Sequence, residues 1–111
     1  MLEAQEAGRA AAAAGALACD VNAACRAPIE GAGLGEYFRH RMGHGIGMNV
    51  HERPFLSPED GTRLEAGMTF TDEPSIMIPG RYSVRIEDII VVEEHGGRML
   101  NSYSNRLVAN P

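Results

Sequence analysis

A change in residue type near position 31 constrains the fold of this 111-residue chain more than any other feature. Before that point the sequence is rich in alanine, which has the highest intrinsic helix propensity, and it predicts helices over roughly 2–17 and 20–31. We expect Asp20 to cap the second helix and Pro28 to kink or shorten it. The glycines that follow residue 30 should end it.

After residue 35 the sequence becomes typical of strands. The segments "GMTFTDEPSIMI" and "RYSVRIEDIIVVEE" carry β-branched residues and alternating patterns, and "EYFRH" leads into a glycine-rich stretch. "SPEDG" and "PG" predict turns, and "EHGGR" predicts a hairpin loop before a last strand near "MLNSY". Helices followed by strands with short turns indicate an α+β fold with a mostly antiparallel sheet, and the length suits one domain.

The composition excludes several classes of function. A net charge of −5 without any basic run argues against a nucleic-acid partner, because phosphate binding needs a basic surface. Glu3 and Glu6 stand where a leader peptide needs positive charge, and no stretch approaches the ~20 apolar residues of a membrane span. Cys19 and Cys25 form neither a CxxC pair nor a disulfide framework. We therefore expect a cytoplasmic protein with no membrane partner.

The segment "HRMGHGIGMNVHE" (40–52) holds three of the four histidines of the chain. Its glycines disfavour a helix, so the spacing of His40 and His44 is not that of a helical zinc motif. In an unbroken strand His44 and His51 would point to opposite faces. The glycines allow a bulge that gathers the three imidazoles in one pocket, and they allow a strand or ligand to approach closely. The alternative is that these are ordinary surface or core histidines.

Two glutamates are candidate partners of these histidines. A hairpin centred on the glycine of "IPGRY" places Glu73 opposite Glu87, with Arg85 on the same face. Opposed carboxylates repel, and their burial costs several kcal/mol unless a cation lies between them or one is protonated. A divalent metal would make the pair a binding site. The alternative is an exposed hairpin with solvated charges, in which Asp72 and Asp88 pair on the other face.

Histidine and glutamate together favour a transition metal such as manganese, cobalt, zinc or iron over calcium or magnesium. Histidines that do not bind the ion would serve as proton donors or as hydrogen-bond donors to an oxyanion. This combination predicts metal-assisted hydrolysis.

Three segments in this order, "HRMGHGIGMNVHERP", "LEAGMTFTDEPSI" and "YSVRIEDIIVVEEHGG", resemble the C-terminal part of the pita-bread metallopeptidases. The closest branch is that of the Xaa-Pro dipeptidases and proline aminopeptidases, and the resemblance covers roughly residues 20–108. It implies the C-terminal half of a pita-bread fold, with two helices followed by a curved, mostly antiparallel sheet. It also implies hydrolysis of Xaa-Pro or related short peptides.

Such enzymes hold two metal ions, usually manganese or cobalt, with two aspartates, one histidine and two glutamates. The resemblance implies that the metal ligands of this chain are His44, Glu73 and Glu87. It implies that the catalytic residues are His40 and His51, which contact the substrate and shuttle protons, and Arg85, which braces the strand of the second glutamate.

The two aspartate ligands of the family have no counterpart, since Asp20 is the only aspartate before His40. Residues 1–111 therefore predict a partial catalytic domain whose N-terminal half is absent, and the expected partners are that half or a second copy. Two other functions stay open. One is a creatinase-like amidinohydrolase that works without metal, and the other is a non-catalytic binding module or remnant.

Overall fold

The computed structural model describes residues 1–109 and contains two α-helices, one 3-10 helix and seven strands. The helices are α1 (Leu2–Ala11), α2 (Ala18–Gly31) and the 3-10 helix η1 (Gly35–Tyr37). The strands are β1 (Gly43–Gly45), β2 (Glu52–Leu56), β3 (Thr69–Asp72), β4 (Ser75–Ile78), β5 (Tyr82–Arg85), β6 (Asp88–Glu93) and β7 (Gly96–Met99).

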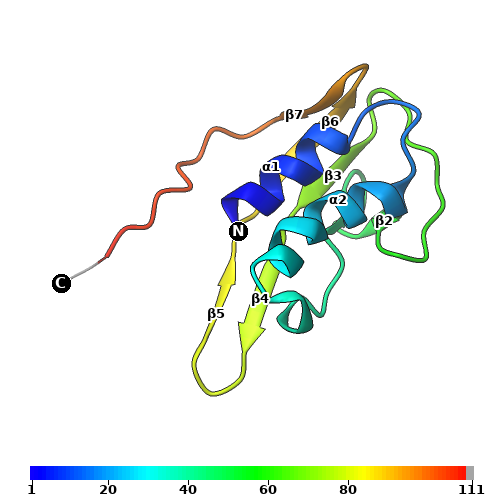
Figure 1. Cartoon of the computed structure of the whole chain (residues 1–111). Helices are drawn as coiled ribbons and strands as arrows, with labels where there is room; N and C mark the ends of the chain where they lie inside the picture. Colours follow the sequence, from blue (N-terminus) through cyan, green and yellow to red (C-terminus); the bar gives the residue numbers. More distant parts are fainter. Residues whose placement is uncertain (110–111) are drawn as a thin grey trace.

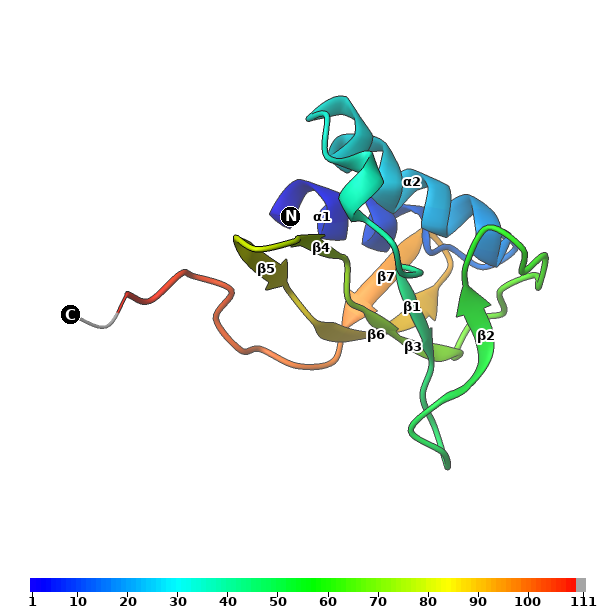
Figure 2. The same cartoon turned by 90° about the horizontal axis from the view of Figure 1, so that it is seen from below.

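Five strands form one antiparallel sheet in the order β2-β1-β3-β6-β7, and β4 and β5 form a separate hairpin beyond it (Figure 1). Both helices lie on one face of the sheet (Figure 2). We call this the helix face and the opposite one the open face. The predicted α+β class, with two helices before a mostly antiparallel sheet, is confirmed.

The strand register matches the predicted hairpin. Ser75 pairs with Arg85 in the β4–β5 ladder, and Asp72 pairs with Asp88 in the β3–β6 ladder, so both ladders have the same centre. That centre is Gly80, whose positive φ of 71° suits the turn. Glu73 and Glu87 fall in the interval between the two ladders, where no strand pairing joins them.

The core lies between the helices and the sheet and is built from small and aliphatic side chains. A Cβ atom on Gly8 of α1 would lie 2.4 Å from the terminal methyl of Met42, so α1 sits directly on that side chain. The fully buried side chains include Val21, Phe38 and Phe70. Each such burial contributes about 1.5–3 kcal/mol relative to an exposed side chain. Alanines in both helices let the helices approach the sheet closely.

The segment between the helices differs from the prediction. Helix α1 ends at Ala11 instead of residue 17, because the following residues bond to strand backbones: Ala14 N–H donates to the Glu93 carbonyl at 2.9 Å. The predicted cap at Asp20 is wrong. The residue before α2 is Leu17, whose backbone bridges Arg63, and Asp20 lies exposed in the first turn of the helix.

The segment from the end of α2 to the first strand also differs in part from the prediction. The helix continues past Pro28 to Gly31, so the predicted end is confirmed and the expected shortening at Pro28 is wrong. The stretch that leads into the glycine-rich segment forms η1 and an extended connection instead of a strand. Arg26 fixes this turn, because its guanidinium donates to the carbonyl of Phe38 at 2.7 Å.

Candidate metal and peptide-binding site

The glycines of β1 let two strands approach the backbone that carries His44. A Cβ on Gly43 would lie 1.7 Å from the carbonyl oxygen of Thr71, and a Cβ on Gly45 would lie 2.4 Å from that of Arg53. The register with β2 shifts between His44 and Gly45. The predicted irregularity and the predicted close approach of neighbouring strands are therefore confirmed.

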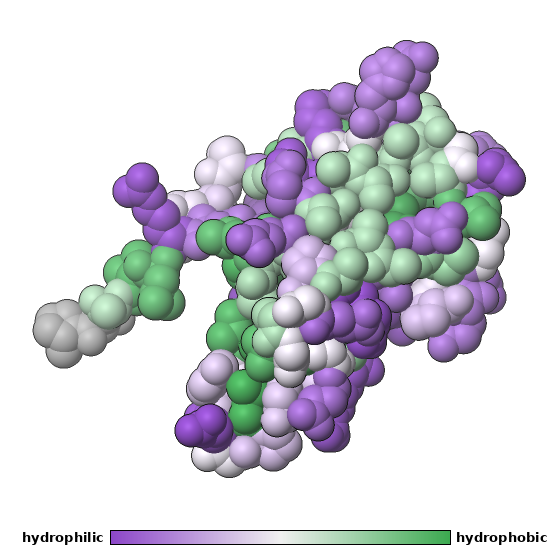
Figure 3. Space-filling model, viewed as in Figure 1, coloured by the Kyte–Doolittle hydropathy of each residue, from purple (hydrophilic) through white to green (hydrophobic). Residues whose placement is uncertain are grey.

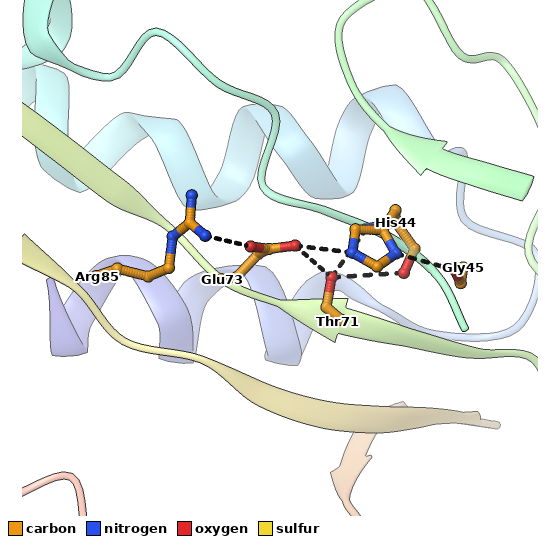
Figure 4. A network of polar contacts seen from close by, with 5 residues as sticks. All are labelled: His44, Gly45, Thr71, Glu73 and Arg85. Atoms are coloured by element: carbon orange, nitrogen blue, oxygen red, sulfur yellow. Dashed lines mark hydrogen bonds and ion pairs between the residues drawn. The ribbon is translucent and has the colours of Figure 1, made fainter. Parts of the chain in front are cut away.

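The imidazole of His44 faces the carboxylate of Glu73 (Figure 4). Its Nε2 lies 3.1 Å from Oε1 of Glu73, and only 8% of the His44 side chain and 12% of the Glu73 side chain are exposed. On the other side of the ring, Nδ1 lies 2.9 Å from the carbonyl oxygen of Gly45. A nitrogen beside a carbonyl oxygen must carry the proton, so Nδ1–H donates to Gly45.

That hydrogen bond decides what the other ring nitrogen presents. With the proton on Nδ1, the Nε2 atom of a neutral His44 directs a lone pair at a carboxylate oxygen of Glu73. Two acceptors at 3.1 Å repel each other unless a cation lies between them. The pair therefore forms a partly enclosed site whose two donor atoms suit a metal cation.

Two further side chains hold Glu73 in place (Figure 4). The hydroxyl of Thr71 accepts a hydrogen bond from the His44 backbone N–H at 3.0 Å and donates one to Oε1 of Glu73 at 2.8 Å. A guanidinium nitrogen of Arg85 lies 3.2 Å from Oε2 of Glu73, and half of the Arg85 side chain is exposed. Both carboxylate oxygens of Glu73 thus have a partner that fixes their direction.

A hollow of about 570 Å³ opens beside this pair. The structure brings five of the six predicted site residues to its lining: His40, His44, His51, Glu73 and Arg85. The rings of His44 and His51 have centroids 4.2 Å apart and are tilted by 41°. His40 and His51 are exposed, so they could reach a molecule that occupies the hollow.

Glu87 does not join this group. Its side chain is exposed and lines a separate groove together with Met1, Leu2 and residues 103–107. In the part of the chain that the structure describes, no three His, Cys, Asp or Glu side chains gather as a metal-binding group. The arrangement supplies two adjacent donors, His44 and Glu73, whereas the side chain of Glu87 lies on another surface.

Thr71 is the site residue that the sequence reasoning missed. It lies in β3 two positions before Glu73, which directly follows that strand, and residues two apart in an extended chain share a face. A threonine two positions before Glu73 could therefore have been predicted to place its hydroxyl beside the Glu73 carboxylate.

The other face of the same strands carries two buried aspartates. Asp88 accepts hydrogen bonds from Gln5 and Asn105, both at 2.9 Å, whereas neither carboxylate oxygen of Asp72 has a partner within residues 1–109. Burial, followed by the charge of Asp88, raises the pKa of Asp72 to about 8. Asp72 and Asp88 pair across the β3–β6 ladder, as the alternative of an exposed hairpin expected, and both side chains are buried.

No helix within residues 1–109 is long and apolar enough to cross a membrane.

Known proteins resemble both the sequence and the structure. The model of metallopeptidase family M24 matches residues 1–94. The chain is 45% identical over 97 residues to the probable dipeptidase PepE of Mycobacterium bovis, covering 87% of this chain and 26% of that protein. It is 44% identical over 108 residues to the Xaa-Pro dipeptidase of Lactobacillus delbrueckii subsp. lactis, covering 97% of this chain and 29% of that protein.

Solved structures agree with the sequence matches. The Xaa-Pro dipeptidase from Bacillus anthracis superposes with a TM-score of 0.92 at 43% identity, over 96% of this chain and 30% of that chain. The prolidase from Pyrococcus horikoshii OT3 gives a TM-score of 0.91 at 41% identity, over 96% and 31%. The fold is thus a portion of the pita-bread fold, and the chain spans less than a third of the length of these relatives.

Proposed function

The chain belongs to metallopeptidase family M24, and we propose that it supplies part of the active site of a metal-dependent peptidase for Xaa-Pro or related short peptides. The family uses divalent metal ions, which agrees with the donor types of the hollow. The observation that carries the proposal is the contact of His44 with Glu73 beside a hollow lined by two more histidines. We also propose that the protein is cytoplasmic.

The geometry of the His44–Glu73 pair fits a metal ion. Ligand bonds of about 2.1 Å put two neighbouring ligand atoms roughly 3 Å apart, and Nε2 and Oε1 are separated by 3.1 Å. The Nδ1–H bond to Gly45 fixes the tautomer that leaves Nε2 free to bind a metal. We propose manganese or cobalt as the native ion, with zinc and iron as the other transition metals that suit these ligands.

In the proposed chemistry the residues of the hollow have different roles. A bound divalent ion would supply Lewis-acid polarisation and lower the pKa of water. His44 and Glu73 would hold it, while His40 and His51 would donate hydrogen bonds and protons to the peptide at the scissile bond. Arg85 would keep the Glu73 carboxylate aimed at His44.

Glu87 remains the proposed third ligand of this chain. It lies between the two ladders, as Glu73 does, and its exposed side chain would have to move from its present groove to reach His44 and Glu73. A bound cation would compensate the repulsion that otherwise drives the two carboxylates apart. The same exposed position also favours the second candidate function, a non-catalytic pita-bread module, since within residues 1–109 His44 and Glu73 meet without a third donor.

The proposed partner is the rest of a pita-bread domain, supplied either by an adjoining segment or by a second chain. Exposed apolar side chains gather on the β4–β5 hairpin and on the C-terminal segment, where Figure 3 shows green surface. They include Met77, Tyr82, Leu107 and Val108, with 52%, 55%, 98% and 80% of their surfaces exposed. An apolar surface of this kind usually marks an interface.

A chimaera tests the proposed function. The matching segment of the Bacillus anthracis Xaa-Pro dipeptidase is replaced by residues 1–111, and hydrolysis of Ala-Pro and of creatine is measured with manganese and with a chelator. We expect cleavage of Ala-Pro that the chelator abolishes. Cleavage of creatine in the presence of chelator would instead establish the amidinohydrolase. A folded chimaera that binds no metal and cleaves neither compound would establish the non-catalytic module.

A further inference from the structure

Strand β5 has a backbone partner on one side only. It pairs with β4 in a two-stranded ladder, and within residues 1–109 no other strand joins it (Figure 1). All four residues of the strand, Tyr82–Arg85, are exposed. The N–H and C=O groups on its outer side therefore lack a partner in the sheet, and an edge of this kind pairs readily with another extended chain.

The space beside this edge is open. A groove of about 860 Å³ is lined by residues 84–87 on one side and by residues 1–3 and 103–107 on the other. The groove gives room for a further strand next to β5. Such a strand would cover Tyr82 and Val84, two large apolar side chains that are exposed.

Two opposite charges flank β5. Arg81 directly precedes the strand, and Glu87 lies two residues after its end. Both side chains are exposed, and neither makes an ion pair with any of residues 1–109. Six residue steps of an extended chain span about 20 Å, so these two charges cannot pair within one copy of the strand.

The sequence around β5 is complementary to itself in an antiparallel register. When two copies pair with Val84 opposite Val84, Tyr82 of each copy faces Ile86 of the other, and Arg81 of each copy faces Glu87 of the other. Apolar side chains then meet on one side of the new ladder, and two ion pairs form on the other side.

The neighbouring registers oppose like charges. With Ser83 at the centre, Arg81 of each copy faces Arg85 of the other, and with Arg85 at the centre the two copies of Arg85 face each other. Like charges directly opposite each other destabilise a ladder. Charge therefore selects the register that is centred on Val84.

We propose that two copies of this chain associate through their β5 edges, with Val84 at the centre, and form a four-stranded sheet in the order β4-β5-β5-β4. This inference goes beyond the proposed peptidase and does not rest on it. A second copy on this edge excludes any other part of a pita-bread domain from it. One strand pair is a small interface, so we expect a dissociation constant of about 10–100 µM.

Sedimentation velocity of residues 1–111 in a buffer with chelator tests the association, over concentrations from about 1 µM to 1 mM. We expect a monomer–dimer equilibrium with no larger species, because pairing of the two β5 edges is isologous and leaves neither edge free.

Charge reversal tests the register. Arg81→Glu and Glu87→Arg should each raise the dissociation constant about tenfold or more, because each places like charges opposite each other twice. The double variant restores both pairs and should associate within about threefold of the parent chain. Arg98→Glu and Glu94→Arg make the same changes of net charge in the β6–β7 hairpin and should alter the constant less than about threefold.

Cross-linking gives a second measurement that does not depend on the charges. Val84→Cys, combined with Cys19→Ser, should form a disulfide between copies under mild oxidation, since the two cysteines face each other and Cys25 is buried. Met77→Cys in the same background is the matched control. Met77 is exposed on β4, and its two copies would lie three strand spacings apart, or about 14 Å, which is too far for a disulfide.

A chain that stays monomeric up to about 1 mM would overturn the proposal and leave the edge to the rest of a pita-bread domain. It would be overturned equally by a double variant that associates no more tightly than the single ones, by equal losses in the control variants, or by equal cross-linking at positions 77 and 84. Because these measurements use neither metal nor substrate, such a failure would leave the proposed hydrolysis intact.

Discussion

Asp72 is the last residue of β3 and Glu73 follows it in the chain, yet the two carboxylates have opposite surroundings. Glu73 points to the open face and meets His44, Thr71 and Arg85. Asp72 points to the helix face, where neither of its oxygens has a partner within residues 1–109. The difference teaches that the alternation of side chains along an extended chain separates an acid held beside a histidine from an acid that the core forces toward its neutral form.

The largest expected effect concerns catalysis on the open face. In the active chimaera, Glu73→Gln should lower kcat/KM for Ala-Pro about a hundredfold or more, because it removes a charged donor beside His44. Asp72→Asn should leave kcat/KM within about threefold, since its side chain lies on the helix face. Isothermal titration with Mn²⁺ should show the same contrast in affinity. Equal losses from both variants would mean that the two faces are not functionally separate.

The next effect concerns the free energy of unfolding on the helix face. Burial raises the pKa of Asp72 from 3.8 to about 8, so the folded chain holds a proton that the unfolded chain releases between these pH values. Stability should therefore fall as pH rises from about 4 to 8. Asp72→Asn should remove this decline and stabilise the chain by about 1–3 kcal/mol at pH 8. Urea unfolding across this pH range measures both quantities.

The exposed acid at position 65 is the matched control, and Glu65→Gln should leave the pH dependence unchanged. An identical pH profile for Asp72→Asn and the parent chain would show that Asp72 has found a partner in solution.

The strand alternation behind this comparison was readable from the sequence, whereas the surroundings of the acids were only partly so. The turn at Gly80 and the regular alternation on both sides of it predicted the register, and the glycines around His44 predicted the irregularity of β1. Both signals are local, because a turn glycine and a strand period act through neighbouring residues.

What failed depended on contacts far along the chain. Helix α2 begins directly after Leu17, whose backbone bridges Arg63, so no local pattern could have moved the helix start away from Asp20. The burial of Asp72 and Asp88 depends on Gln5 of α1 and on the C-terminal segment that packs over them. The side chain of Glu87 likewise follows its groove neighbours, which lie at both ends of the chain.

Substitutions of Thr71 test the hydrogen bonds that hold Glu73 on the open face, with a smaller expected effect. Thr71→Val keeps the shape of the buried side chain but removes the hydrogen bonds to the His44 backbone and the Glu73 carboxylate. We expect a loss of about 1–3 kcal/mol in the free energy of unfolding, since the His44 N–H is left unsatisfied. Thr71→Val should also lower the affinity for Mn²⁺. Thr71→Ser retains the hydroxyl and should recover most of that affinity. If valine and serine behave alike, the hydroxyl does not position Glu73.

Among the partners of Glu73 on the open face, we expect Arg85 to have the smallest effect on the free energy of unfolding. Half of its side chain is exposed, and solvent-exposed ion pairs contribute about 0–1 kcal/mol because water screens them and the long side chains lose freedom. Arg85→Gln should therefore change the free energy of unfolding by less than about 1 kcal/mol, and the change should shrink in high salt. Urea unfolding at low and high ionic strength measures it. A larger, salt-independent loss would mean that the guanidinium is buried against the hollow. The open face would then be enclosed at Arg85, as the helix face is, and would not be hydrated there.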